Sequence, residues 1–182
     1  MSSKALKKSD APEVSAGVVI LREDPDLGWV FLALEVYRRL DLPKGHVDDK
    51  DANGAHSSIE QIMNGARREA LQESGYILSF DSDTELNPNL RIARMSWGKD
   101  HTVCKSYDKS GNLKKDVYIF AAETACPHYM IGVNEKGFKE HDRGYWIPIS
   151  EIENCALHKY LKPGVAWAVS RLAANDEEGI PL

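Results

Sequence analysis

The chain has 182 residues, of which 28% are charged and 42% are hydrophobic, and its formal net charge is −5. This size and composition indicate one globular domain, and the negative balance excludes a protein that holds nucleic acid by bulk positive charge. A polyanionic substrate would therefore need local cations, either bound metal or a few Lys and Arg side chains.

Both ends of the chain are polar. Residues 1–12 have no apolar segment of the kind that a signal peptide requires, so we expect a flexible N-terminus. We expect residues 176–182 to form a flexible tail, which leaves residues 13–175 as a single domain.

Three cysteines, Cys104, Cys126 and Cys155, are far apart and odd in number. This spacing favours neither a disulfide framework nor a zinc site, and it predicts a reducing, cytoplasmic location. The sequence has no apolar run long enough to cross a membrane, so we expect no membrane partner.

The first half of the domain begins with two predicted strands. Residues 14–21 are rich in β-branched side chains and residues 29–37 are largely apolar, so we expect a hairpin. Pro43 and Gly45 then favour a loop. The following segment, Asp48–His56, is polar and predicts a solvated insertion.

A helix is predicted next. Ser57, with Glu60 three residues later, is typical of a helix N-terminus, and Ser58 with Gln61 is a second candidate. Gly75 stands where a left-handed C-terminal cap belongs. Small or apolar residues recur at helical spacing, which predicts a buried stripe. They are Ile59, Met63, Ala66 and Ala70.

The second half predicts several strands and a closing helix. The strand candidates are residues 76–80, 90–97, 102–107, 116–124 and a short run within 143–152. Ser150 predicts the start of a short helix, and residues 162–174 predict a longer one with Pro163 near its start. The pattern indicates an α+β domain with a mixed sheet between helices.

The central helix carries the chemistry. Glu69, Gln72 and Glu73 lie three or four residues apart and so share a face. Two converging carboxylates repel each other unless a cation lies between them, and Mg²⁺ prefers such ligands. A solvated acidic face, with Arg67 and Arg68 as partners within the helix, is the alternative for this stretch alone.

The wider spacing resembles the signature of the Nudix hydrolases. That signature reads Gly, five residues, Glu, seven residues, Arg-Glu, an aliphatic residue, any residue, Glu-Glu, any residue, Gly and a hydrophobic residue. The matching positions are Glu60, Arg68, Glu69, Glu73 and Gly75, with Gln72 in place of the first Glu of the Glu-Glu pair.

The first glycine of the signature has two candidates. Gly54 has the right spacing to Glu60, but the sequence LPKGHV, residues 42–47, resembles the family's loop and offers Gly45. Fourteen residues separate Gly45 from Glu60, so the second choice needs a nine-residue insertion, which we place at about Asp48–His56. A surface loop tolerates that length because closure entropy grows slowly.

The resemblance implies a Nudix-type α/β/α sandwich and a pyrophosphohydrolase that cleaves a nucleoside diphosphate linked to another group. It implies that Glu69 and Glu73 bind Mg²⁺ or Mn²⁺, with the carbonyl of Gly45 as a third ligand. It further implies that Arg68 orients the glutamates through an ion pair, with Glu60 as its support.

Other site residues follow from the same resemblance. Residues 139–152 are similar to a late segment of the diadenosine tetraphosphate hydrolases, which makes Glu140 a candidate extra metal ligand or general base. A surface glutamate in a charged loop is the alternative. Lys44, Arg38 and His46 lie in or near the LPKGHV loop and are candidates for binding the polyphosphate; solvated loop side chains would explain them equally.

Dinucleoside polyphosphates are the first substrate class that the resemblance implies. Diphosphoinositol polyphosphates, mRNA caps and other nucleotides are the alternatives, and basic residues within 99–115 leave RNA open. Gln72 removes one negative charge from the signature, which implies a weaker second metal or, as the rival from another class, a nucleotide-binding protein with little activity.

Overall fold

The computed structural model describes residues 13–178, with side chains described through residue 173. The predicted flexible N-terminus, residues 1–12, and the last part of the predicted tail, residues 179–182, lie outside the described residues. Residues 176–178 continue the closing helix, which ends at Glu178.

Within the described residues, nine strands form one mixed sheet. The strands are β1 (Glu13–Asp24), β2 (Gly28–Val36), β3 (Arg39–Asp41), β4 (Lys44–His46), β5 (Ile77–Ser79), β6 (Ile92–Arg94), β7 (Thr102–Tyr107), β8 (Leu113–Glu123) and β9 (Arg143–Pro148). Their main order is β3-β2-β1-β8-β6-β5, and β4 pairs with β1, β7 with β8 and β9 with β2.

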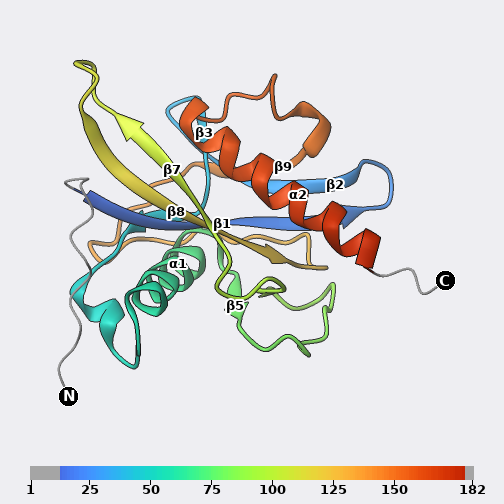
Figure 1. The fold of residues 1–182 in the computed structure, drawn as a ribbon. Helices are drawn as coiled ribbons and strands as arrows, with labels where there is room; N and C mark the ends of the chain where they lie inside the picture. Colours follow the sequence, from blue (N-terminus) through green and yellow to red (C-terminus); the bar gives the residue numbers. More distant parts are fainter. Residues whose placement is uncertain (1–12, 179–182) are drawn as a thin grey trace.

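Two long helices cover the sheet from opposite sides, α1 (Ser58–Ser74) and α2 (Lys162–Glu178) (Figure 1). Three short 3-10 helices, η1 (Asp49–Ala52), η2 (Ile149–Glu151) and η3 (Lys159–Leu161), lie in the connections. None of the described helices is long and apolar enough to cross a membrane. The arrangement confirms the predicted α/β/α sandwich.

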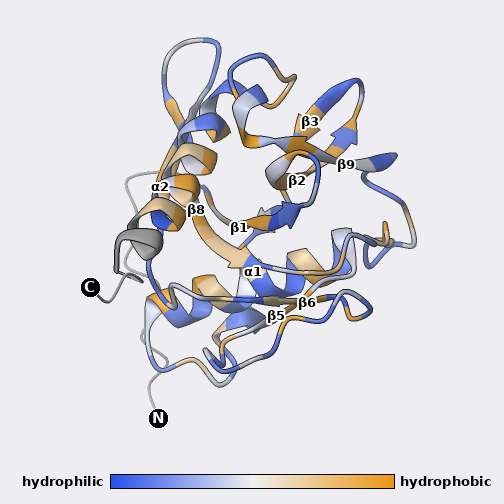
Figure 2. Cartoon of the chain, turned by 90° about the vertical axis from the view of Figure 1, so that its right-hand side faces the viewer, coloured by the Kyte–Doolittle hydropathy of each residue, from blue (hydrophilic) through white to orange (hydrophobic). Residues whose placement is uncertain are grey.

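Each face of the sheet has its own hydrophobic core because successive strand residues point to opposite faces. Ala16, Val18 and Ile20 of β1 pack with Met63 and Ala66 of α1. The alternate residues of β1 pack instead with the α2 face, which includes residues 165–172. Hydrophobic residues accordingly concentrate on β1 and β8, between the two helices (Figure 2).

The strand predictions hold best where the apolar runs are long. β1 and β2 form the predicted antiparallel hairpin, with Leu21 opposite Phe31. β7 covers the predicted residues 102–107, and β8 extends the predicted strand backwards to Leu113. The predicted strand at 90–97 shortens to β6, whose three residues pair with β5 and at Arg94 with β8.

Two local predictions were wrong. The region around Pro43 and Gly45 was expected to be a loop, but Lys44–His46 pairs with Ser15–Gly17 of β1, because Pro43 stands just outside the paired residues. No helix begins at Ser150; that residue lies inside η2, which has no side-chain cap.

The turn between β2 and β3 is strained. Val36 pairs with Arg39, so Tyr37 and Arg38 form a two-residue turn, and both have positive φ, 48° and 64°. Glycine and asparagine usually fill such turns because bulky side chains disfavour positive φ. The turn exposes 91% of Tyr37 and carries Arg38 to the surface.

Candidate active site

Helix α1 fixes two carboxylates one turn apart on its inner side. Glu69 and Glu73 are only 7% and 5% exposed. The predicted caps set the limits of the helix: the Ser57 hydroxyl accepts a hydrogen bond from the amide of Glu60 at 3.3 Å, and Gly75 has φ of 75°. Both caps are thus confirmed, and they place the last turn of the helix beside β4.

Strand β4 runs against these carboxylates. The amide of Lys44 donates to Oε2 of Glu73 at 3.0 Å. A Cβ atom on Gly45 would lie 2.3 Å from Cδ of Glu69, so any side chain there would collide with the carboxylate. Only glycine fits at this position because of that collision. Its backbone φ is not positive, so backbone conformation alone would not require glycine.

Arg68 orients Glu69. Its Nη1 donates to Oε1 of Glu69 at 2.7 Å, and its Nη2 donates to the carbonyl of His46 at 2.8 Å. The remaining donors go to Asp51, from Nε to Oδ1 at 3.1 Å and from Nη2 to Oδ2 at 3.2 Å. One guanidinium thus ties together β4, η1 and α1.

The expected pairing of Arg68 with Glu60 was wrong. Glu60 lies near the start of α1, where its carboxylate pairs with Lys99 at 3.1 Å and accepts the amide of His56. Arg68 is more than two turns further along the helix, on another side of it, so the two side chains do not meet.

Asp51 holds the position that was assigned to Glu60. Five residues separate it from Gly45, as the signature requires, and sixteen separate it from Arg68 where the signature has seven. The nine extra residues therefore follow Asp51. They form the rest of η1, a short turn and the first turn of α1, while Asp51 itself is only 5% exposed rather than part of a solvated loop.

Asp51 was missed because an aspartate replaces the expected glutamate in a segment rich in aspartates. The interval from Gly45 was the one signal that could have identified it. A shorter side chain still reaches Arg68 because η1 folds back onto α1, where Asn64 donates to the carbonyl of Asp51 at 2.9 Å.

A loop after β8 closes the other side of the site. The amide of Met130 donates to the carbonyl of Ser74 at 2.9 Å, and a Cβ on Gly132 would lie 2.0 Å from the carbonyl oxygen of Gln72. Because the loop packs closely against the end of α1, Glu140 lies on the same pocket as Glu69. Nδ2 of Asn134 holds the Glu140 carboxylate at 3.1 Å.

An open pocket of about 340 Å³ lies between these three elements. Its lining comprises Lys44, Gly45, His46, Asp48, Arg68, Glu69, Gln72, Asn134, Glu135, Lys136 and Glu140. The structure thus brings together most of the candidate residues, including the half-buried Gln72.

The electrostatics of the pocket favour a bound cation. Burial raises the pKa of Glu69 although Arg68 opposes this, and the charges of Glu140 and Asp48 raise it further. Burial and the charge of Glu69 raise the pKa of Glu73 well above its usual range. A divalent cation between them would offset the repulsion that disfavours the two carboxylates.

The donor set fits Mg²⁺ or Mn²⁺. Among the described side chains, no group of three or more His, Cys, Asp and Glu is arranged as a ready-made metal cage. Mg²⁺ is commonly held by one or two carboxylates together with water and substrate phosphates, and Glu69 and Glu73 supply those two carboxylates. Glu140 borders the same pocket. Backbone hydrogen bonds join Pro43 and Val47 to β1, so the carbonyl of Gly45 between them, the expected third ligand, also faces β1 and not the carboxylates.

Of the two candidate phosphate contacts in this strand, Lys44 directs its ammonium away from the pocket and His46 stays at it. The Lys44 ammonium pairs with Asp41 at 3.1 Å and its side chain is 11% exposed, on the side of the sheet covered by α2. His46 is exposed at the pocket, where its carbonyl is engaged by Arg68.

Arg38 lies in a second, larger pocket. Its lining comprises Arg38, Arg39, Lys105, Ser106, Tyr107, Cys155, Ala156, Leu157, His158, Lys159, Tyr160 and Lys162. None of these lining residues carries a carboxylate. Lys44 lies between the two pockets, because its amide contacts Glu73 while its ammonium pairs with Asp41 and interacts with Tyr160, which lines the second pocket.

No family model matches this chain, and no curated protein matches it either. Solved structures do match. A Caenorhabditis elegans Ap4A hydrolase binary complex superposes with a TM-score of 0.60 at 19% identity, over 89% of this chain and 98% of that one. A NUDIX hydrolase from Alicyclobacillus acidocaldarius gives 0.59 at 14% identity, over 91% and 93%.

A third match is the NUDIX domain of Shewanella oneidensis NrtR, complexed with ADP ribose. It gives a TM-score of 0.54 at 15% identity and covers 94% of each chain. Identities this low establish a shared architecture. With a mixed sheet between two helices, and α1 beside β4, the chain has the fold of the Nudix hydrolases.

Proposed function

We propose that this protein is a metal-dependent Nudix pyrophosphohydrolase that cleaves a nucleoside diphosphate linked to another group. The contact of Arg68 with both Asp51 and Glu69, beside Gly45 and Glu73, carries the proposal. A purely structural helix would have no need to bury both carboxylates against β4, because Glu73 has no ion pair among the described side chains and burial without a counter-charge is unfavourable.

Each residue has a role in this proposal. Glu69 and Glu73 would hold Mg²⁺ or Mn²⁺, and Arg68 fixes the rotamer of Glu69. A bound divalent ion would neutralise pyrophosphate oxygens and lower the pKa of an attacking water. We expect Glu140, which lines the pocket from its loop, to accept a proton from that water or to add a ligand.

The second pocket supports a substrate with a large anionic part. Among the described residues, Arg38 and Arg39 make no ion pair, and the cations of this pocket outnumber its anions. Tyr107 is 58% exposed there and offers a face on which a base could stack. A polyphosphate chain spanning Lys44 would place one end here and its anhydride at the carboxylates.

Dinucleoside polyphosphates of the diadenosine tetraphosphate kind are the substrate class that we place first. Similarity to the Ap4A hydrolase supports this choice. Diphosphoinositol polyphosphates, mRNA caps and ADP-ribose are the alternatives, and RNA remains a candidate partner. Gln72 favours one rival, a nucleotide-binding protein of low activity, because it lines the metal pocket without a charge.

A substrate panel tests the proposal. The four compounds are incubated with Mg²⁺ or with Mn²⁺, and the products are identified by mass. We expect metal-dependent cleavage of diadenosine tetraphosphate into two nucleotides. Binding of a nucleotide without turnover of any compound would favour the rival.

The free state of the three cysteines supports a reducing compartment for this activity.

A further inference from the structure

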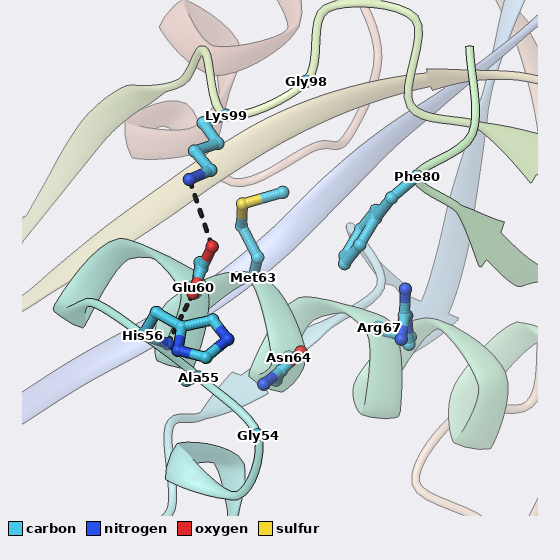
Figure 3. A pocket seen from close by; sticks show the side chains of 10 residues that line it. All are labelled: Gly54, Ala55, His56, Glu60, Met63, Asn64, Arg67, Phe80, Gly98 and Lys99. Carbon is cyan, nitrogen blue, oxygen red and sulfur yellow. Dashed lines mark hydrogen bonds and ion pairs between the residues drawn. The ribbon is translucent and has the colours of Figure 1, made fainter. Parts of the chain in front are cut away.

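A separate cavity of about 440 Å³ lies along one flank of α1, bordered by the loops at Phe80 and Lys99 (Figure 3). Its lining comprises Gly54, Ala55, His56, Glu60, Met63, Asn64, Arg67, Phe80, Gly98 and Lys99. The four residues from α1 follow the i, i+3, i+4, i+7 spacing of one helix face, which is turned away from Glu69 and Glu73. This volume suits a small organic molecule.

The nine extra residues after Asp51 help to build this cavity. They supply its rim at Gly54, Ala55 and His56 and its wall at Glu60. In Figure 3, Met63 lies between that wall and the opposite one, which Phe80 and Arg67 form. The cavity is thus built partly from the nine residues that this chain has in excess of the signature.

Arg67 is the unusual member of the lining. Its guanidinium lies over the ring of Phe80, 3.9 Å from the centroid. Arg22, Arg143 and Arg171 also lie over aromatic rings, and each of those three pairs with a carboxylate. Among the side chains that the structure describes, Arg67 has no ion pair and no hydrogen-bond acceptor.

Glu60, Lys99 and Asn64 are already engaged, whereas the imidazole of His56 has no hydrogen-bond partner among the described residues. The carboxylate of Glu60 is occupied by Lys99 and the amide of His56. The amide group of Asn64 donates to the carbonyl of Asp51. The cavity therefore has two cationic side chains, Lys99 and Arg67, and one carboxylate, Glu60. Lys99 pairs with Glu60, so the donors of Arg67 have no acceptor in the cavity. Met63, 4% exposed, and Phe80 supply apolar surface beside them.

We propose that this cavity binds a small organic anion. Its carboxylate or phosphate pairs with the guanidinium of Arg67, which lies over Phe80, and its apolar body packs on Met63 and Phe80. Arginine recognises planar and tetrahedral oxyanions through paired donors, so both anion types suit it. The cavity is distinct from the hydrolytic pocket, and the proposal does not depend on the proposed activity.

Benzoate and phenyl phosphate serve as probes, since they share a ring and differ in the anion. The chain is labelled at its methionine methyl groups, the Met63 signal is assigned with Met63→Leu, and each probe is titrated in EDTA. We expect a saturable shift of the Met63 methyl signal, with the dissociation constant raised at least about tenfold in Arg67→Gln. Inorganic phosphate alone should bind more weakly than phenyl phosphate.

Two matched variants test whether the Met63 shift depends on the charge of Arg67 in particular. Arg143→Gln removes the same charge from another arginine over an aromatic ring, at Tyr145, and should leave the titration unchanged. Glu73→Gln should also leave it unchanged, which keeps this test apart from hydrolysis. The proposal is overturned if Met63 does not respond to either probe, or if Arg67→Gln, folded by its thermal transition, binds as the parent does.

Discussion

Asp51 and Arg68 form a two-point contact, with Nε to Oδ1 at 3.1 Å and Nη2 to Oδ2 at 3.2 Å. Asp51 is nearly buried, and its Oδ2 also accepts the amide of Asp48 at 2.8 Å. A planar guanidinium with two fixed acceptors cannot rotate freely. Asp51 therefore fixes the orientation of the Arg68 side chain, which in turn positions Glu69.

We therefore expect Asp51→Asn to weaken metal binding by about 10–100-fold, as loss of a supporting residue usually does. Isothermal titration with Mn²⁺ measures this. Glu60→Gln is the control, because Glu60 pairs with Lys99 away from the site and its change should leave Mn²⁺ affinity alone. If Glu60→Gln weakened Mn²⁺ binding more than Asp51→Asn did, Glu60 and not Asp51 would be the residue that supports Arg68.

Gly45→Ala should disrupt the metal site directly. Its Cβ would meet Glu69 Cδ at 2.3 Å, so either β4 or the carboxylate must move. We expect a stability loss of about 1–3 kcal/mol and a loss of Mn²⁺ binding. Gly28→Ala is the control: its φ of 72° is strained for alanine, but no atom lies within 4 Å of the added Cβ, so Mn²⁺ affinity should persist.

Glu73→Gln should abolish hydrolysis and preserve the fold. Loss of one of two charged ligands is expected to reduce turnover on the order of 100-fold or more. The helix keeps its shape because glutamine fills nearly the same volume. Turnover with Mg²⁺ and the far-ultraviolet circular dichroism spectrum are the two measurements. A variant with the parent's turnover would remove Glu73 from the metal site.

Gln72→Glu should strengthen metal binding and raise Mg²⁺-dependent activity. The added carboxylate borders the same pocket as Glu69, and we expect the Mn²⁺ dissociation constant to fall by roughly tenfold, equivalent to about 1.4 kcal/mol. If both the rate and the affinity stay as they are in the parent, residue 72 lies outside the metal's ligands.

The stability of the metal-free protein should fall as pH rises. Folding raises the pKa of Glu69 and Glu73 above 4.5, so the native state binds more protons than the unfolded state above that pH. The stabilising contribution of these two groups is then complete below about pH 4.5 and is lost as pH rises through the raised values. Excess Mn²⁺ should remove the decline, because it binds the ionised carboxylates.

Thermal unfolding midpoints between about pH 5 and 8, in EDTA and in Mn²⁺, check this. The comparison with Glu73→Gln isolates one carboxyl group, since that variant should show a shallower decline in EDTA. If the unfolding midpoint in EDTA fell equally steeply with pH in the parent and in the variant, folding would not raise the pKa of Glu73.

The sequence predicted those parts of the fold that local patterns control. The long apolar runs of β1, β2 and β8 identify buried strands, and Ser57 and Gly75 fix the ends of α1. β3 and β4 have only three residues each and acquire their structure from pairing with β2 and β1. Such short strands depend on partners distant in sequence, which local propensity does not report.

The site shows the same division. Glu69 and Glu73 follow from helical spacing, while the partner of Arg68 depends on how η1 folds back onto α1. The cation pocket around Arg38 brings together the β2–β3 turn, β7 and η3, and no interval along the sequence reports that meeting. The side of the sheet to which Lys44 points depends on its pairing with Gly17.

The parallel pairing of β1 with β8 has a consequence for folding kinetics. Glu13 lies opposite Lys115, 102 positions further along the chain, and nine residue pairs of this kind form the centre of the sheet. Contacts between such distant segments close large loops and slow the search for the native topology. The β1–β2 hairpin and α1 can form early, but β4 has its place beside Glu69 only once β1 is fixed, so metal affinity should emerge late in refolding.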